Sequence, residues 1–265
     1  DLEIDFSDVN GYKFSQDCIT NDLIGKMIIY GKNGSGKTNL GYALCDLKAT
    51  LGFSPEINTL HSFISNADSD SDITTFTYTF LFNQKKDTAV YEYSKSDMVN
   101  LVSEKLLVNN HVLYEYDFKE NTFITVDSDY FHNNDIYSIY QSSTNSSLPF
   151  LRWCVNNGSV DKDSIFHKIY NYGSKITQIF TPTTAAVRLT KNELDVLDKN
   201  VKELENFLVY MGIDCKLTME KLPDGTKELY FVFKNRKVSF LENASSGTLS
   251  LFNFYIHFLM PHKES

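Results

Sequence analysis

The most informative stretch of this sequence is Gly31-Lys32-Asn33-Gly34-Ser35-Gly36-Lys37-Thr38. It satisfies the pattern G-x-x-x-x-G-K-[ST] at every fixed position. The apolar run at residues 26–30 comes directly before it and has the composition of a short, buried, parallel strand. Residues 37–51 come directly after it and carry leucines at helical spacing. The sequence therefore predicts a tight, glycine-rich turn between a strand and a helix.

A turn of this composition, a P-loop, is suited to holding phosphate groups. Glycines let the backbone curl so that successive N–H groups point inward. The helix start adds unpaired donors and the positive end of its dipole. We expect Lys37 to reach the β- and γ-phosphates of ATP and the Thr38 hydroxyl to bind Mg²⁺. The predicted nucleotide-binding residues are Gly31, Asn33, Gly34, Ser35, Gly36, Lys37, Thr38 and Asn39. The alternative is a glycine-rich turn with an incidental lysine.

Composition excludes several classes of protein. Of 265 residues, 42% are hydrophobic and 14% aromatic, which indicates a globular chain rather than a disordered one. The net charge of −9 disfavours a general nucleic-acid coat. The four cysteines lie far apart without a CxxC pair, so we expect neither zinc nor disulfides, and a reduced, cytoplasmic chain. No apolar run reaches the roughly 18 residues of a membrane span.

Residues 74–126 have the composition of an antiparallel sheet. The segments 74–82, 88–93, 106–116 and 123–126 are β-branched and aromatic, and turn-forming residues separate them. We expect a meander with hairpin connections. Residues 2–9 alternate between apolar and polar side chains and predict a further strand near the N-terminus.

The rest of the chain favours helices and one small set of strands. Residues 128–147 predict a surface loop with short helical pieces, and residues 148–180 predict helices. The clearest amphipathic helix covers residues 192–211, and Thr190 and Glu193 fit a capping box at its start. The last elements are strands at 216–221, 228–233 and 236–241, a turn at Asp224-Gly225, and a helix at 247–259.

A second motif, Ser245-Ser246-Gly247-Thr248, opens this last predicted helix. Small residues at a helix start leave N–H groups exposed, which makes a second anion site. The alternative is an ordinary serine N-cap. Together with the loop GKNGSGKT and the Asn39-Leu40 that follows it, this run resembles the ABC-type ATPase heads. The similarity is greatest to SMC, RecF and OLD-like ATPases and to their relatives in bacterial antiphage systems.

The resemblance implies an α/β fold, namely a P-loop NTPase of the ABC-head type with an antiparallel β subdomain and a helical arm. It implies a P-loop lobe with a β insert at residues 1–127, a helical arm at 128–190, and the remainder of the head at 191–265. In such heads Ser245, Ser246 and Gly247 would cap the γ-phosphate held by a partner's P-loop. Two heads would then enclose two nucleotides.

The resemblance also implies a function. We expect an ATP-binding head that forms a homo-oligomer within a bacterial antiphage defence system, with an effector partner such as a nuclease and no membrane partner. DNA or RNA is a further partner of such ATPases. The first alternative is a DNA-repair or chromosome-maintenance ATPase of the SMC or RecF kind, which long coiled coils would favour. The helix at 192–211 spans only about 30 Å. A transporter ATPase subunit is a third class, which the β insert disfavours.

The sequence departs from these heads in lacking a Walker B strand, a switch histidine and a clear Q-loop glutamine. A complete head has a Walker B strand, an apolar run ending in Asp-Glu, shortly after the signature helix, and no such run is present. We therefore expect a fragment that binds nucleotide without hydrolysing it alone. Two details stay open. The first is whether Tyr12 or Phe14 stacks on adenine or packs in the core. The second is whether the basic cluster Lys234, Arg236 and Lys237 contacts nucleic acid or forms a solvated edge.

Overall fold

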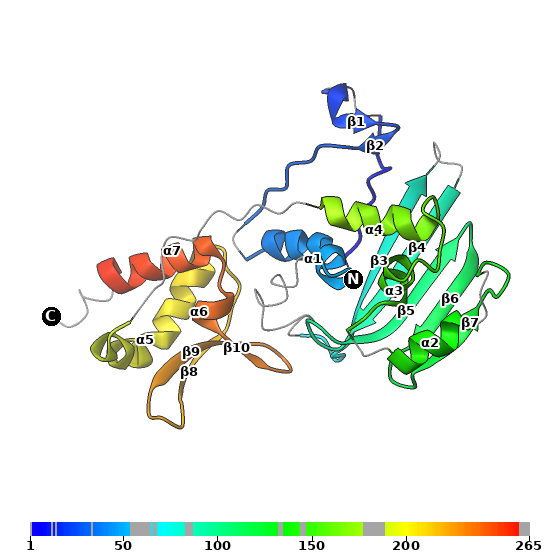
Figure 1. Ribbon diagram of the computed structural model, residues 1–265. Helices are drawn as coiled ribbons and strands as arrows, with labels where there is room; N and C mark the ends of the chain where they lie inside the picture. The colour runs from blue at the N-terminus through cyan, green and yellow to red at the C-terminus, as the bar shows by residue number, and fades with distance from the viewer. Residues whose placement is uncertain are drawn as a thin grey trace.

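A computed structural model describes residues 2–11, 13, 15–32, 34–53, 65, 68–82, 87–131, 135–143, 147–176 and 189–259. Tyr12, Phe14, Asn33 and the end of the predicted arm near Phe180 lie outside the described residues. A five-stranded sheet with three helices forms one part of the molecule (Figure 1), and a smaller group of helices and strands from the C-terminal third forms another. Helix α1, Lys37–Thr50, lies between the two parts.

The large sheet is an antiparallel meander, which confirms the prediction for residues 74–126. Its strands follow one another in chain order. They are β3 (Thr74–Phe82), β4 (Asp87–Lys95), β5 (Leu101–Val108), β6 (His111–Asp117) and β7 (Thr122–Val126). The single strand predicted at 106–116 is wrong, because the chain turns at Asn109 and Asn110. Both residues have positive φ, 50° and 65°, as a two-residue hairpin loop requires.

Aromatic side chains fill the core between this sheet and its helices. Helices α2 (Ile136–Ser143), α3 (Phe150–Asn156) and α4 (Ile165–Lys175) confirm the helical prediction for this region. The Tyr114 ring lies with its centroid 4.9 Å from that of Phe150 and 5.8 Å from that of Phe166. All three rings are completely buried. Burial of such large rings supplies the main driving force for the packing of α3 and α4 on the sheet.

A buried carboxylate, Glu104 of β5, joins the sheet to α3. It accepts hydrogen bonds from the hydroxyls of Tyr91 (2.9 Å) and Tyr114 (2.7 Å). It also accepts from the backbone N–H groups of Phe150 (2.5 Å) and Leu151 (3.1 Å). Burial raises the pKa of Glu104, and these donors oppose the rise. The carboxylate therefore satisfies the otherwise unpaired donors at the start of α3.

The C-terminal part is built on the amphipathic helix α5, Lys191–Tyr210. Its capping box is present as predicted, with Thr190 and Glu193 bonding each other's backbone. Strands β8 (Leu217–Lys221), β9 (Lys227–Val232) and β10 (Lys237–Ser239) form an antiparallel sheet in the order β10-β9-β8. Helix α6 (Phe240–Asn243), helix α7 (Ser246–Phe254) and a π-helical turn (Tyr255–Leu259) follow. The strand predicted at 236–241 ends earlier, because Phe240 turns into the core and begins α6.

The N-terminal segment differs most from the prediction. Residues 2–9 and 26–30 form no strand, and the strands here are the short antiparallel pair β1 (Ile19–Thr20) and β2 (Leu23–Ile24). Residues 26–30 are exposed rather than buried, with Ile28 at 89% and Tyr30 at 90% relative accessibility. An apolar run becomes a buried strand only when neighbouring strands pair with its backbone. Within the described ranges, no strand lies beside residues 26–30.

Candidate functional site

Three glycines shape the turn that precedes α1. Gly34 and Gly36 have φ values of 77° and 84°, in the left-handed region that side chains with a Cβ rarely adopt. At Gly31 a Cβ would lie 3.0 Å from the Ser35 hydroxyl oxygen, closer than nearly all real contacts. The predicted helix is confirmed, since α1 begins at Lys37 directly after Gly36. The tight curl expected of a P-loop is therefore present around the described glycines.

The Lys37 side chain folds back over this loop. Its Nζ donates hydrogen bonds to the carbonyl oxygens of Gly31 (2.9 Å) and Lys32 (2.7 Å), and Ser35 Oγ lies 3.5 Å away. Hydrogen bonds between charged groups are stronger than those to neutral carbonyls, so a phosphate oxygen would compete well for this ammonium. The glycine curl and the ammonium of Lys37 together fit a bound triphosphate.

The first turn of α1 offers one residue for a metal ion. Thr38 and Asn39 are both exposed there. Among the described residues, no group of three or more His, Cys, Asp or Glu side chains is placed to hold a metal. Mg²⁺ commonly binds through few protein ligands together with waters and substrate phosphates. The Thr38 hydroxyl would therefore share the ion with phosphate and water oxygens.

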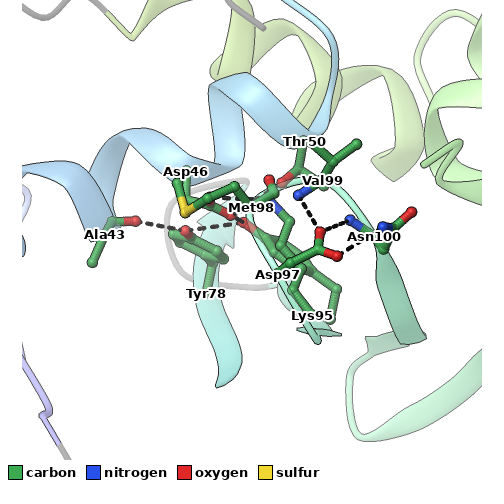
Figure 2. Close-up of polar contacts among 10 residues, drawn as sticks. Ala43, Asp46, Thr50, Tyr78, Lys95, Asp97, Met98, Val99 and Asn100 are labelled. Carbon is green, nitrogen blue, oxygen red and sulfur yellow. Dashed lines mark hydrogen bonds and ion pairs between the residues drawn. The ribbon is translucent and has the colours of Figure 1, made fainter. Parts of the chain in front are cut away.

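The far half of α1 is fixed on the large sheet by a buried polar network. Asp46 of α1 accepts from Lys95 Nζ at 3.0 and 2.9 Å, and from the Tyr93 hydroxyl at 2.7 Å. The Tyr78 hydroxyl donates to the carbonyl oxygen of Ala43 at 2.9 Å (Figure 2). Burial raises the pKa of Tyr93, with the neighbouring Tyr78 and Asp46 adding to the rise. Sequence reasoning missed this network; its only local signal is an aspartate among the leucines of α1.

The opposite face of α1 packs closely on α4. At Gly173 of α4 an added Cβ would lie 2.6 Å from Leu51 Cδ1, so glycine is required for this approach. Lys48 Nζ donates to the carbonyl oxygen of Ile176 at 2.6 Å. The helix is thus held on two sides along its C-terminal half, while its N-terminal turn and the loop stay largely exposed. This arrangement presents the loop to solvent on a rigid support.

A turn of the C-terminal part borders the loop. A Cβ at Gly212, just after α5, would lie 3.9 Å from Lys32 Cδ, and one at Gly34 would lie 4.0 Å from Ile213 Cγ2. The turn residue Gly212 has φ of 87°. This proximity had no signal in the sequence, because residues 32 and 212 are brought together only by the packing of the two parts.

The second motif begins α7 with a capped end. Ser245 is the N-cap, and its hydroxyl accepts from the backbone N–H of Thr248 at 3.1 Å. Its Oγ also lies 2.9 Å from the Thr248 hydroxyl. The Ser245 side chain therefore acts as an ordinary serine N-cap, which was the alternative interpretation of this motif. Ser246 is exposed at the first position of the helix, and Gly247 is half-buried beside it.

The basic cluster of the β9–β10 turn is paired with acidic residues. Lys234 Nζ lies 3.3 Å from Asp70, and Arg236 lies 2.7 Å from Asp72. Lys237 pairs with Glu220 on β8. The cluster is solvent-exposed and ion-paired, and the positive charge that a nucleic acid would need is largely neutralised here.

Cys18, Cys45, Cys154 and Cys215 are all free thiols. No helix of the described segments combines the length and apolar character needed to cross a membrane.

Comparison with known families places this site in context. Residues 26–265, which include the loop, α1 and α7, match a family model described as "AAA domain, putative AbiEii toxin, Type IV TA system". The chain belongs to this family. It therefore carries a P-loop domain of the AAA type, a class of ATPase that binds nucleotides. Neither a curated protein nor a solved structure matches the chain.

Proposed function

We propose that this AAA domain binds ATP with Mg²⁺ through residues 31–39 and forms a homo-oligomer around the nucleotide. The observation that carries the proposal is the position of Lys37 Nζ over the glycine loop, bonded only to the neutral oxygens of that loop. An incoming triphosphate would replace these partners with charged oxygens. The loop N–H groups and the start of α1 would supply the remaining donors.

The nucleotide part of the proposal is tested by Lys37→Ala. We expect the variant to lose measurable ATP binding in a calorimetric titration with Mg²⁺, because it lacks the cation at the β- and γ-phosphates. Its thermal unfolding should match that of the wild type, because Lys37 bonds only to its own loop. Lys162→Ala is the control, since it removes an exposed cation outside residues 31–39. Equal affinity of wild type and Lys37→Ala would refute the assignment.

For the oligomer, we propose that the start of α7 meets the γ-phosphate held by a second copy. Ser246 and Gly247 support this role, because the Ser245 cap bonds Thr248 and leaves the first N–H groups of α7 for another acceptor. Ser246→Arg should therefore keep ATP binding but lose ATP-dependent assembly, measured by light scattering with a non-hydrolysable analogue. Ser250→Arg, one turn further along α7 and also exposed, is the control. If monomeric Ser246→Arg loses ATP binding, α7 contacts the nucleotide of its own chain instead.

We further propose that the assembly is the ATPase component of a bacterial antiphage defence system and controls an effector such as a nuclease. The family description, which names a putative toxin of a toxin–antitoxin system, supports a role in restraining or releasing a harmful activity. Co-expression with the neighbouring gene products of its source and measurement of phage plaque formation tests this role. If the Lys37→Ala variant still reduced phage plaque formation, the defence role would not depend on nucleotide binding. An SMC- or RecF-like role in DNA repair would appear instead as DNA-stimulated ATP binding.

A further inference from the structure

A cavity lies at the C-terminal end of α1, the opposite end of the helix from the P-loop. Its volume is about 190 Å³. An engineered cavity of about 150 Å³ holds a benzene molecule, so a small organic ligand fits here. Its wall combines apolar side chains of Ala49, Val99 and Leu101 with the polar groups of Thr50, Lys95 and Arg152. Figure 2 shows Thr50, Lys95 and Val99 grouped beside the end of α1.

The guanidinium of Arg152, on α3, packs closely against the backbone in this wall. It lies directly against Gly52, where an added Cβ would come within 2.3 Å of Arg152 Cζ. Gly52 has φ of 84°, a conformation that favours glycine, and a side chain there would also displace the Arg152 guanidinium. Arg152 is partly buried, and within the described part of the chain its side chain makes no hydrogen bond or ion pair. A guanidinium carries five N–H donors in a fixed fork.

Capping of α1 does not explain this arginine. Three carbonyl oxygens of the last turn already accept backbone hydrogen bonds. Leu47 accepts from Leu51 at 3.0 Å, Lys48 from Phe53 at 3.0 Å, and Ala49 from Gly52 at 2.9 Å. The donors of Arg152 are therefore not needed at the helix end, and they remain for a partner within the cavity.

The charges around the cavity select the ligand. Lys95 is neutralised by Asp46, whose oxygens lie 3.0 and 2.9 Å from Nζ. The Thr50 hydroxyl donates to Asp46 at 3.1 Å. Arg152 is then the one positive charge of the wall without a counter-ion among the described residues. A planar carboxylate matches the fork of a guanidinium through two parallel hydrogen bonds.

We propose that this cavity binds a small organic carboxylate, with its two oxygens on Arg152 and its apolar part against Ala49, Val99 and Leu101. The site is separate from the P-loop. The proposal therefore does not depend on nucleotide binding, and its experiment is carried out without nucleotide.

The test uses the fluorescence of Trp153, the only tryptophan in the chain and the neighbour of Arg152. Benzoate, acetate and inorganic phosphate are titrated into the whole chain. We expect saturable binding of benzoate, with acetate and phosphate each weaker by about tenfold or more, because acetate has only a methyl group and phosphate has no apolar part. Tighter binding of phosphate than of benzoate would overturn the choice of ligand. A linear, non-saturating response to all three would overturn the site.

Variants identify the group that binds. Arg152→Gln should weaken benzoate binding by about tenfold or more, and Arg152→Lys, which keeps the charge but not the fork, should lie between it and the wild type. Lys162→Gln removes an exposed cation elsewhere and should leave binding unchanged. Thermal unfolding monitors the fold of each variant, and Arg152→Lys serves as the decisive comparison if Arg152→Gln does not fold. Unchanged affinity in a folded Arg152 variant would refute the proposal.

Discussion

Lys95 Nζ lies 3.0 and 2.9 Å from the two carboxylate oxygens of Asp46, and the side chains are only 1% and 6% exposed. The pair joins the end of β4 to the middle of the helix that carries the P-loop. A buried ion pair contributes little by itself compared with apolar packing, but removal of one partner leaves a buried charge uncompensated. The Lys95–Asp46 pair therefore fixes the position of α1 on the sheet.

We predict that Lys95→Met lowers the free energy of unfolding by about 3–5 kcal/mol, because Asp46 stays buried without its cation. The double variant Asp46→Asn with Lys95→Met should lose less than the sum of the single changes. Urea denaturation of the four proteins gives the coupling energy. Lys105→Met is the control, because the Lys105–Glu115 pair is 30% exposed on both sides. That change should cost about 1 kcal/mol or less. Additive single effects would contradict the coupling.

Two glycines close in sequence should respond in opposite ways to alanine. Gly36 has φ of 84°, so Gly36→Ala should destabilise the chain by about 1–2 kcal/mol and weaken ATP binding. Gly41 lies within α1 without a positive φ, and a Cβ there would meet nothing within 4 Å. Gly41→Ala should therefore stabilise the chain by up to about 1 kcal/mol and leave affinity unchanged. Thermal unfolding and calorimetry measure both effects. Equal responses would argue against the described loop geometry.

The proposed role of Thr38 predicts a specific dependence on Mg²⁺. Thr38→Val keeps the shape of the side chain but removes the hydroxyl that would bind the ion. ATP affinity should fall by about tenfold in the presence of Mg²⁺ and stay unchanged in EDTA. The exposure of Thr38 makes a large effect on stability unexpected. An equal loss of affinity under both conditions would place Thr38 on the phosphates rather than on the metal.

Glu104 predicts a pH dependence of stability. Burial raises its pKa above the ordinary value of 4.5, so the folded chain binds this proton more readily than the unfolded chain. Its contribution to the free energy of unfolding is therefore greatest below the unfolded pKa and decreases as pH rises through the folded pKa. The difference in stability between wild type and Glu104→Gln should fall by at most about 1.4 kcal/mol per pH unit above pH 4.5. A difference that rises with pH would mean that the four donors outweigh burial.

Several elements could be predicted from the sequence because their signals are local. The P-loop glycines need positive φ or close approach wherever the rest of the chain lies. The capping box at Thr190 closes within one helical turn. The meander follows from alternation and turn residues, although the prediction makes one strand of residues 106–116 and misses the first half of β5. Each of these features depends on neighbours a few residues apart.

Other features depend on segments that are far apart in the chain. Residues 26–30 are as apolar as a buried strand, but no described strand pairs with them, and backbone pairing rather than composition determines burial. Asp46 and Lys95, Asp72 and Arg236, and Gly52 and Arg152 are ordinary residues in the sequence until folding brings them together. The sequence by itself determined the phosphate-binding motif and the types of most elements, since these rest on backbone conformation and periodicity. Only the tertiary structure decided which charges are buried, paired or left facing a cavity, because solvation and Coulomb energy depend on distances that the sequence does not contain.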